Sequence, residues 1–410
     1  MKCLSWKQGL AALCLLQSAA ATAYSTQMLD SIISRQEGLG NSGAPTGQIE
    51  LGILQEALQR GIETTRDPSR AHAWSAYLAQ SVASSVGSIQ NASADIAYPL
   101  DRLSLGNSLL HTYEASGNAT ALSAIDALYK SISLQPTNAN GGLWYYTYQN
   151  LSYLDGMWSF APFSTRYTMR LDPANLVASI DDVVLQLDLL WEHCHDASSG
   201  LLFHGYDAAK QRVWANPTTG ASHVVWGRSV GWYMMALVDT LELLPISHQS
   251  AQWKRLHSHF AALSQAVVQA ADEETGVWWQ VVTAPGQEGN YLESSSAAMF
   301  VYALLKGSRL GYVDRSGTAY SGNSNYSTAL LARDANATAV ATATKAYTYI
   351  ADHFVVREAN GTLSYNNTVS VCSLNSNGTY GYYVSQPIAF NSLLGTAAFV
   401  LASLEHEAMQ

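Results

Sequence analysis

Apolar residues recur with a period close to 3.6 along most of the chain, and short breaks rich in Gly, Asn, Asp and Pro separate these stretches. The spacing predicts about a dozen helices. They are expected over residues 26–35, 48–61, 69–86, 103–116, 119–133, 155–169, 173–194, 223–244, 250–271, 293–311, 338–355 and 386–406. Several ends carry suitable chemistry, because Asp172 precedes Pro173 and because Gly117 and Gly311 follow apolar runs. The chain is therefore predicted to be predominantly helical.

The degree of apolar character indicates how these helices pack. Residues 229–238 are apolar on more than one face, which predicts burial against two neighbours, as in the inner ring of a helical barrel. Residues 203–214 and 276–283 are extended and aromatic, so short hairpins are expected at one mouth of the helical body. Residues 314–333, rich in Ser, Gly, Asn and Tyr, are predicted to form an inserted loop. No composition shift resembles an interdomain linker, so residues 24–410 are predicted to form a single domain.

Composition and charge narrow the class of protein. Apolar residues make up 48% of the chain and charged residues 13%, which indicates a globular fold rather than a disordered one. The formal net charge is −10, and no Lys/Arg cluster is longer than a pair. A nucleic-acid or anionic-membrane partner is therefore not expected.

The first 23 residues have the pattern of a secretory signal. Lys2 and Lys7 form a basic start, residues 10–16 are an apolar run, and Ala21 to Ala23 form a small-x-small exit. The run is shorter than the roughly 20 residues of a membrane-spanning helix. We expect cleavage before Tyr24 and a secreted, extracellular protein.

Cysteines and glycosylation triplets fit an oxidising compartment. Beyond the signal only Cys194 and Cys372 remain, and the sequence leaves open whether they form a disulfide. Acceptor triplets for N-glycosylation begin at Asn91, Asn118, Asn150, Asn325, Asn336, Asn360, Asn366 and Asn377.

Two aspartates stand at predicted helix starts. Asp155 lies between Tyr153 and Trp158, and Asp101 follows Pro99. A carboxyl group desolvated among aromatic residues keeps its proton near neutral pH and can act as a general acid. Asp is also a preferred N-cap residue, so helix capping is an alternative for both positions. If the two acids face each other, they would share a proton and their pKa values would separate.

Aromatic and polar residues gather between positions 203 and 232. His204 stands in a predicted hairpin, and Trp214, Trp226, Arg228 and Trp232 follow it. Sugar C–H faces stack on indole rings and a guanidinium pairs with a carboxylate, so this combination is typical of a sugar-binding site. An aromatic core with a salt-bridged arginine is the alternative.

The run His193, Cys194, His195 and Asp196 suggests metal ligands. Adjacent residues point in different directions on a helix, whereas ligands recur at i+3 or i+4, so a polar helix end is the better interpretation and no metal site is expected. The sequence has no Gly-rich phosphate loop, Cys-x-x-Cys pair or Gly-x-Ser-x-Gly motif. Nucleotide-binding and esterase functions therefore lose support.

Four runs of residues stand in order along the chain, from Gly141 to Phe163, Gly200 to Asp207, Trp226 to Tyr233 and Tyr291 to Met299. The segments at 371–372 and 383–387 add to them. Together they resemble glycoside hydrolase family 105, the unsaturated rhamnogalacturonyl hydrolases. The resemblance extends from about Leu100 to the C-terminus.

The resemblance implies an all-α (α/α)6 barrel with short hairpins and loops at one mouth. It also implies an unusual reaction on oligosaccharides left by polysaccharide lyases. Members hydrate the C4=C5 double bond of a non-reducing-end unsaturated uronic acid, here expected to be Δ4,5-galacturonyl-rhamnose from pectin. No cofactor or metal is required, and the protein is expected to act as a monomer.

The resemblance also assigns roles by position. Asp155 would protonate C4 and then, as a carboxylate, help water to add at C5. Asp101 would hold the water or tune Asp155. Matches to substrate-binding positions are His204, Trp226, Arg228, Trp232 and Trp144. Arg228 is expected to orient the uronate.

Two departures leave the substrate open. Many bacterial members have Trp-His-Lys where this chain has Trp144-Tyr145-Tyr146, so two cationic contacts are lost. Asn391-Ser392 replaces an expected Asn-Asp pair. The alternatives are an unsaturated β-glucuronyl hydrolase acting on other lyase products and a non-catalytic carbohydrate-binding barrel.

Overall fold

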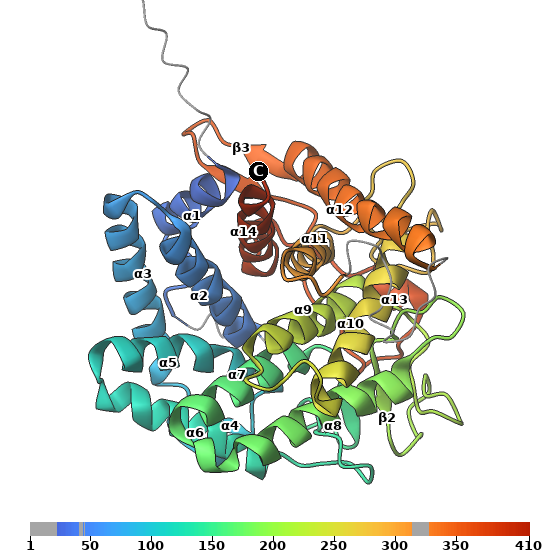
Figure 1. Ribbon diagram of the computed structural model, residues 1–410, viewed down its shortest axis with the longest axis horizontal. Coiled ribbons are helices and arrows are strands. Elements are labelled where there is room, and N and C mark those ends of the chain that lie inside the picture. Colours follow the sequence, from blue (N-terminus) through green and yellow to red (C-terminus); the bar gives the residue numbers. More distant parts are fainter. Residues whose placement is uncertain (1–22, 41–43, 45, 314–327) are drawn as a thin grey trace, which may run out of the picture.

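The helices form two concentric rings (Figure 1). The computed structural model describes residues 23–40, 44, 46–313 and 328–410, with the backbone alone over 328–338. The inner ring consists of α2 (Gly47–Thr64), α5 (Leu105–Ser116), α7 (Gly156–Leu171), α9 (Gly227–Leu243), α11 (Ser294–Arg309) and α14 (Leu393–Ala408). The outer ring consists of α3 (Pro68–Val86), α6 (Ala119–Leu134), α8 (Leu176–Cys194), α10 (Ala251–Gln269), α12 (Thr328–His353) and α1 (Tyr24–Ser34). Because α14 packs against α2, the inner ring closes, and the predicted (α/α)6 barrel is confirmed.

Burial distinguishes the two rings. Every residue of α9 from Gly227 to Leu241 is buried, as is every residue of α11 from Ser294 to Gly307. The outer helix α8 instead buries one stripe that includes Val183, Leu187 and Leu190. A helix enclosed by neighbours on all sides is apolar all round, whereas a surface helix is amphipathic. The two-faced apolar pattern of residues 229–238 therefore marks an inner helix, as predicted.

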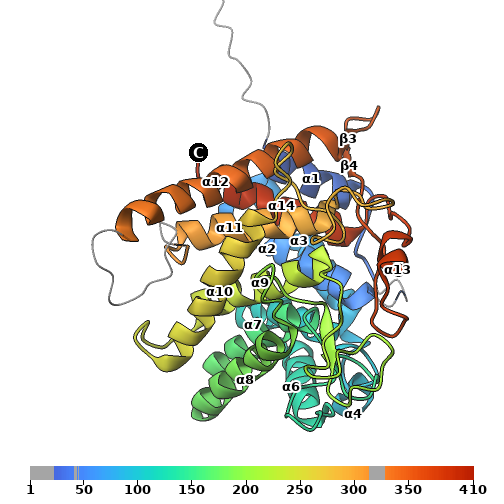
Figure 2. The same ribbon diagram turned by 90° about the vertical axis from the view of Figure 1, so that its right-hand side faces the viewer.

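Short elements connect the helices and gather mostly at one end of the barrel, where α13 (Tyr380–Val384) lies (Figure 2). Strand β1 (Leu151–Tyr153) pairs antiparallel with β2 (Gly205–Asp207), with Ser152 opposite Tyr206. Strand β3 (Val355–Arg357) pairs antiparallel with β4 (Leu363–Tyr365). The remaining short helices are α4 (Ala92–Asp95), η1 (Leu100–Ser104) and η2 (Pro173–Asn175).

Two predicted helices, α9 and α14, begin clearly later than expected. The helix predicted from 223 begins at Gly227, because Trp226 forms an extended bridge with Val281. The helix predicted from 386 begins at Leu393, where the Ser392 side chain caps the Leu394 N–H. Before that helix, Asn391 adopts a left-handed conformation (φ 57°), so the preceding residues cannot belong to it.

The predicted hairpins and inserted loop also need correction. Strand β2 falls within residues 203–214, but its partner β1 lies more than 50 residues earlier, so the pair is not a local hairpin. Residues 276–283 supply only isolated bridges, such as Trp279 with Leu292. Of the loop predicted over 314–333, residues 314–327 lie outside the described residues, and 328–333 belong to α12.

Several predictions concern the chain termini and surface. The predicted signal segment lies outside the described residues except for Ala23 and stays a prediction. Cys194 and Cys372 are buried free thiols, so they form no disulfide. Among the described helices, none is both long and apolar enough to span a bilayer. Of the acceptor asparagines whose side chains the structure describes, five are exposed, namely Asn91, Asn118, Asn360, Asn366 and Asn377.

Candidate active site

A cavity of about 540 Å³ brings together residues from distant parts of the chain. Its wall includes Asp101, Asp155, Trp226, Arg228 and Trp232. Both predicted catalytic residues and three of the five predicted substrate-binding residues therefore line one cavity. Its volume is in the range of about 300–1,000 Å³ that is usual for small-ligand sites.

Asp101 reaches the wall from η1, which is tied to the segment carrying Tyr145. The Leu100 N–H donates to the Tyr145 backbone oxygen at 2.8 Å. The Tyr145 hydroxyl donates to Asp101 Oδ2 at 2.7 Å. The buried Arg102 guanidinium donates to the carbonyl oxygens of Tyr98 and Pro99 at 3.0 and 3.2 Å, which fixes the approach to η1. These bonds hold the Asp101 carboxyl group in place before any substrate binds.

The environment of Asp101 changes its acidity. Asp101 is only 5% exposed. Burial raises its pKa to about 7, because a carboxylate loses hydration inside the protein. The Tyr145 hydrogen bond and the charge of Arg102 oppose this effect, while the neighbouring Asp155 adds to it. Asp101 therefore retains a proton close to neutral pH.

Asp155 follows β1 and occupies the N-cap position directly before α7, but its side chain makes no capping hydrogen bond. Helix capping is therefore not its role, although the position alone suggested it. The Cβ of any residue replacing Gly156 would lie 2.9 Å from Leu100 side-chain atoms, which is closer than real Cβ contacts. Glycine thus allows α7 to begin directly against η1, and the two acid-bearing segments meet.

Asp101 lacks a capping role too. It lies within the first turn of η1, and Pro99 occupies the N-cap position without a side-chain hydrogen bond. The capping alternative is thus excluded for both aspartates, and their carboxyl groups remain available to the cavity.

His204 lies behind Asp155 rather than on the cavity wall. It is fully buried, and its Nε2 lies 3.0 Å from Asp155 Oδ2. Its Nδ1 lies 2.7 Å from the Tyr383 hydroxyl. The imidazole therefore contacts the candidate acid directly, whereas the resemblance had implied a contact with substrate.

Arg228 presents the cavity's positive charge. Its Nη1 and Nη2 donate to the carbonyl oxygens of Val369 and Ser370, each at 2.6 Å, and its guanidinium lies over the Trp226 ring at 5.0 Å. Among the described residues of the wall, it is the only Lys or Arg. Carbonyl oxygens orient the guanidinium without neutralising it, so it can still attract a carboxylate.

The tryptophans differ in their placement. Trp226 and Trp232 line the cavity, and Trp232 stacks on Trp158 with ring centroids 5.1 Å apart. Trp144 is absent from the wall, and Gln135 Nε2 donates to its backbone oxygen at 2.7 Å. Trp214 also lies outside the wall, where its Nε1 donates to the Leu374 backbone oxygen. The sequence thus identified the aromatic character of the site, but not every aromatic residue that forms it.

Tyrosines contribute much of the wall, and most of them were assigned no role from the sequence. The described wall includes Tyr98, Tyr145, Tyr146, Tyr148 and Tyr153. The Tyr145 and Tyr153 rings stack at 4.5 Å. The pair Tyr145-Tyr146, which stands where many bacterial members have His-Lys, was the indication in the sequence that this part of the wall is uncharged.

Other wall residues gave no signal in the sequence. Gln48 stands at the start of α2, in a part of the chain where the resemblance adds little, and Cys372 lies in a segment with little regular structure. The run from His193 to Asp196 contributes nothing to the wall. Within the described ranges, no group of three or more His, Cys, Asp or Glu is arranged to hold a metal ion.

Comparisons with known proteins give consistent matches. The model of Glycosyl Hydrolase Family 88 matches residues 24–321. A protein of Agrobacterium fabrum (strain C58) is 30% identical over 250 residues, which make up 60% of this chain and 96% of that protein. The structure of a family 105 glycoside hydrolase from C. acetobutylicum ATCC 824 has a TM-score of 0.78 and 28% identity, covering 94% of this chain and 99% of that one. The unsaturated glucuronyl hydrolase of Bacillus sp. GL1 shares the fold, with a TM-score of 0.61 and 13% identity over 93% of this chain and 95% of that one.

Proposed function

Because this chain belongs to Glycosyl Hydrolase Family 88 and is similar to the family 105 structure over 94% of its length, we propose that it acts on unsaturated uronyl oligosaccharides. The proposed reaction is hydration of the C4=C5 double bond of a non-reducing-end unsaturated uronic acid. The observation that carries this proposal is the pair Asp101 and Asp155, which stand on one cavity wall together with the cation Arg228. The neighbour named as an unsaturated glucuronyl hydrolase supports the same class of substrate.

The chemistry requires one proton donor that can later act as a base. Asp155 gives its proton to C4 of the enol ether, which leaves an oxocarbenium-like cation at C5. Water adds at C5 and returns a proton to the Asp155 carboxylate. The hemiketal then opens, and the neighbouring sugar is released. Each step leaves Asp155 in the form that the next step needs.

The charges on the wall support this sequence of steps. Asp101 has a pKa of about 7, so near neutral pH the two acids together still hold a proton. Asp101 would hold the attacking water or tune Asp155. Arg228 would pair with the uronate, whose charge would otherwise face only carboxyl groups on this wall.

The uncharged side chains of the wall indicate which leaving-group sugar the cavity would accept. Tyr145 and Tyr146 present uncharged rings where cationic side chains had been expected from many bacterial members. A neutral deoxy sugar can stack on such rings. We therefore favour Δ4,5-galacturonyl-rhamnose from pectic rhamnogalacturonan, and an unsaturated glucuronyl substrate is the second candidate.

The experiment measures the ultraviolet absorbance of the conjugated C4=C5 bond. Purified protein is mixed with lyase-digested rhamnogalacturonan and, separately, with unsaturated glucuronyl disaccharides. Absorbance is expected to fall with the first substrate, and Asp155→Asn is expected to lower turnover at least about a hundredfold while still binding sugar. Asp126→Asn, a change to an exposed aspartate outside the cavity wall, is the matched control and should turn over normally.

Each other outcome contradicts part of the proposal. A fall with the glucuronyl substrate alone would reject the rhamnose leaving group. If neither absorbance fell while the unchanged protein and Asp155→Asn both bound the sugars, the chain would be a carbohydrate-binding barrel instead of an enzyme.

We also propose that the protein is secreted, with the signal removed before Tyr24. The exposed acceptor asparagines support a glycosylated extracellular form. Mass spectrometry of protein secreted by a eukaryotic host should find Tyr24 at the N-terminus and sugars on several of these asparagines. Retention of residues 1–23 would reject the proposal.

A further inference from the structure

His204 lies between Tyr383 and Asp155 in the interior behind the cavity. Both His204 and Tyr383 are fully buried. The Tyr383 hydroxyl lies 2.7 Å from His204 Nδ1, and His204 Nε2 lies 3.0 Å from Asp155 Oδ2. The imidazole packs against the rings of Tyr153 and Trp226, with centroids 5.1 and 4.8 Å away. These contacts restrict the imidazole ring to a single orientation.

The hydroxyl of Tyr383 determines where the imidazole proton lies. Among the described residues, His204 Nδ1 is its one hydrogen-bond partner. A buried hydroxyl that only accepted from Nδ1–H would leave its own proton without an acceptor, which is costly. Tyr383 must therefore donate to Nδ1, and the imidazole proton is then on Nε2. Burial raises the pKa of Tyr383 well above its ordinary value, so the phenol keeps its proton.

Asp155 has one carboxyl oxygen beside this N–H and the other oxygen towards the cavity. Oδ2 is buried and has no hydrogen bond of good geometry, although Nε2 is only 3.0 Å away. The side chain is 11% exposed, and this exposure does not come from Oδ2. An interaction that is poorly aligned in the resting site can strengthen when charge develops on the carboxyl group.

We infer that Tyr383 is a positioning residue that acts through His204 on Asp155. It holds His204 in the Nε2–H tautomer, with this N–H beside Oδ2 of Asp155. This inference rests on the proposed function, in which Asp155 gives its proton to C4 and becomes a carboxylate. A fixed N–H beside Oδ2 stabilises the negative charge as it forms, so the transition state gains more than the substrate complex.

Gln280 connects Tyr383 to the cavity wall by hydrogen bonds. Gln280 Nε2 donates to the Tyr383 backbone oxygen at 3.2 Å, and Gln280 Oε1 accepts from Trp226 Nε1 at 3.1 Å. Trp226 lines the cavity, whereas Tyr383 and His204 do not. The effect of Tyr383 must therefore pass through His204 rather than through contact with the sugar.

The first test reads the tautomer directly and needs no activity. Histidine labelled with ¹⁵N in the ring is incorporated into the full chain, and long-range ¹H–¹⁵N spectra distinguish protonated from unprotonated ring nitrogens. The chain has 11 histidines, so the His204 signals are assigned by their loss in His204→Gln. We expect Nδ1 without a proton and Nε2 with one. A proton on Nδ1 in the unchanged protein would overturn the inference.

The second test compares Tyr383→Phe with a matched control. Tyr233 is also fully buried, and its hydroxyl donates to the Leu187 backbone oxygen at 2.7 Å, but it does not line the cavity. Tyr233→Phe therefore removes a similar hydrogen bond elsewhere. With the unsaturated substrate, Tyr383→Phe should lower kcat about tenfold, because the donor is no longer fixed, and leave KM within about twofold. Tyr233→Phe should leave both constants unchanged.

The outcomes separate this inference from the proposed function. An unchanged kcat in Tyr383→Phe, or an equal loss in Tyr233→Phe, would overturn the positioning role even if the enzyme hydrates its substrate. If Tyr383→Phe does not fold, the tautomer of the unchanged protein still decides the question. Absence of turnover in the unchanged protein, with the expected tautomer, would reject the proposed function and leave the proton arrangement standing.

Discussion

Asp101 shows how strongly its surroundings can alter one carboxyl group. The side chain lies in η1, accepts one hydrogen bond from Tyr145 and is otherwise withdrawn from water. Burial raises its pKa to about 7, whereas the ordinary value is 3.8. Between those two values the folded protein binds a proton that the unfolded chain does not. The group therefore stabilises the fold at acid pH, and this contribution is lost as the pH rises towards 7.

Replacing Asp101 by Asn should remove this pH dependence. Asn keeps an acceptor for the Tyr145 hydroxyl but cannot ionise. We expect Asp101→Asn to be more stable than the unchanged protein at pH 8, on the order of 4 kcal/mol at most, and nearly equal to it at pH 4. Urea unfolding followed by tryptophan fluorescence at both pH values measures this difference. Parallel stability curves for the two proteins would show that Asp101 ionises normally.

Helix α11 illustrates how the start of one element supports the site. Glu293 precedes the helix and is fully buried. Its carboxylate accepts from the Ser295 and Ser296 N–H groups at 3.1 and 2.7 Å, and also from the Val369 N–H at 3.0 Å. The backbone that it holds at 369 supplies a carbonyl oxygen that orients Arg228. The Glu293 N-cap thus connects the start of α11 to the backbone that orients Arg228.

Glu293→Ala should weaken both the fold and substrate binding. Buried N–H groups lose their acceptor, so we expect a loss of about 3 kcal/mol in the free energy of unfolding. We also expect KM to rise about tenfold, because the backbone that holds Arg228 is released. Urea unfolding and steady-state kinetics measure the two effects.

Asp67→Ala is the matched control for this change. Asp67 caps α3 on the surface by accepting from the Ser69 N–H at 2.9 Å. Its loss should cost only about 1 kcal/mol and leave KM unchanged. Equal effects of the two substitutions would contradict the role given to Glu293.

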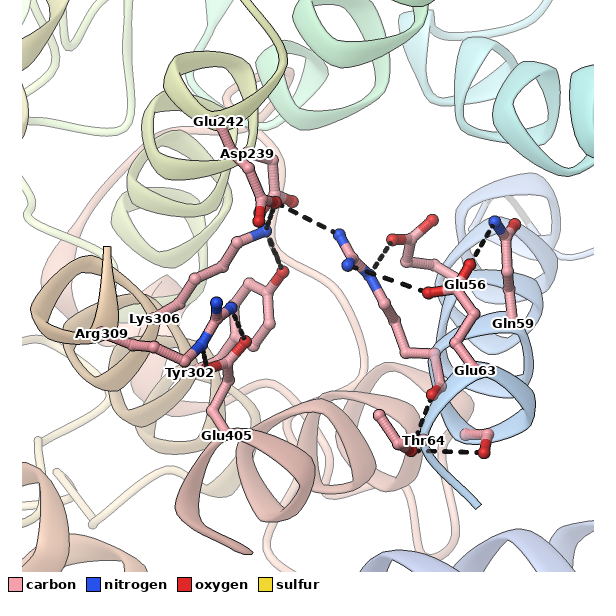
Figure 3. A network of polar contacts seen from close by, with 12 residues as sticks. Glu56, Gln59, Glu63, Thr64, Asp239, Glu242, Tyr302, Lys306, Arg309 and Glu405 are labelled. Atoms are coloured by element: carbon pink, nitrogen blue, oxygen red, sulfur yellow. Dashed lines mark hydrogen bonds and ion pairs between the residues drawn. The ribbon is translucent and has the colours of Figure 1, made fainter. Parts of the chain in front are cut away.

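The barrel interior contains charges as well as apolar side chains. Lys306 of α11 is fully buried, and its Nζ lies 2.7 Å from Asp239 Oδ1 and 2.7 Å from Glu242 Oε2 on α9. These side chains point towards one another between the inner helices, and α2 contributes Glu56 nearby (Figure 3). Asp239 Oδ2 also accepts from Trp158 Nε1 at 2.9 Å, and Trp158 stacks on the wall residue Trp232. These contacts therefore link the inner helices α7, α9 and α11 to the cavity.

Lys306→Met should destabilise the whole barrel. It would leave the buried Asp239 and the half-buried Glu242 without their nearest cation. Breaking a buried pair by removing one partner costs about 3 to 5 kcal/mol. Arg309→Met is the control, because Arg309 pairs with Glu405 at 2.8 Å but is 37% exposed. That change should cost less than about 1 kcal/mol. Similar urea midpoints for the two variants would show that the interior network contributes little.

Periodicity and local motifs were enough to predict the helices. All twelve predicted segments correspond to helices of the barrel, because each segment has the 3.6-residue apolar repeat in its own sequence. The errors fall at helix starts such as those of α9 and α14, where an extended bridge or a left-handed residue ends the preceding segment. The two acids and the aromatic residues around positions 226–232 were likewise identified from short motifs.

Tertiary structure alone decided what each candidate does. Pairing of β1 with β2 brings Asp155 next to His204, although the strands are more than 50 residues apart and carry no local signal of each other. Packing also placed Trp144 outside the cavity wall and Tyr383 behind His204. Burial, proton placement and acidity depend on atoms that meet across the fold, whereas helical propensity depends on neighbours along the chain. The sequence by itself therefore determined the helices and identified the two aspartates. The closed barrel determined the burial, the hydrogen-bond partners and the acidity of their carboxyl groups.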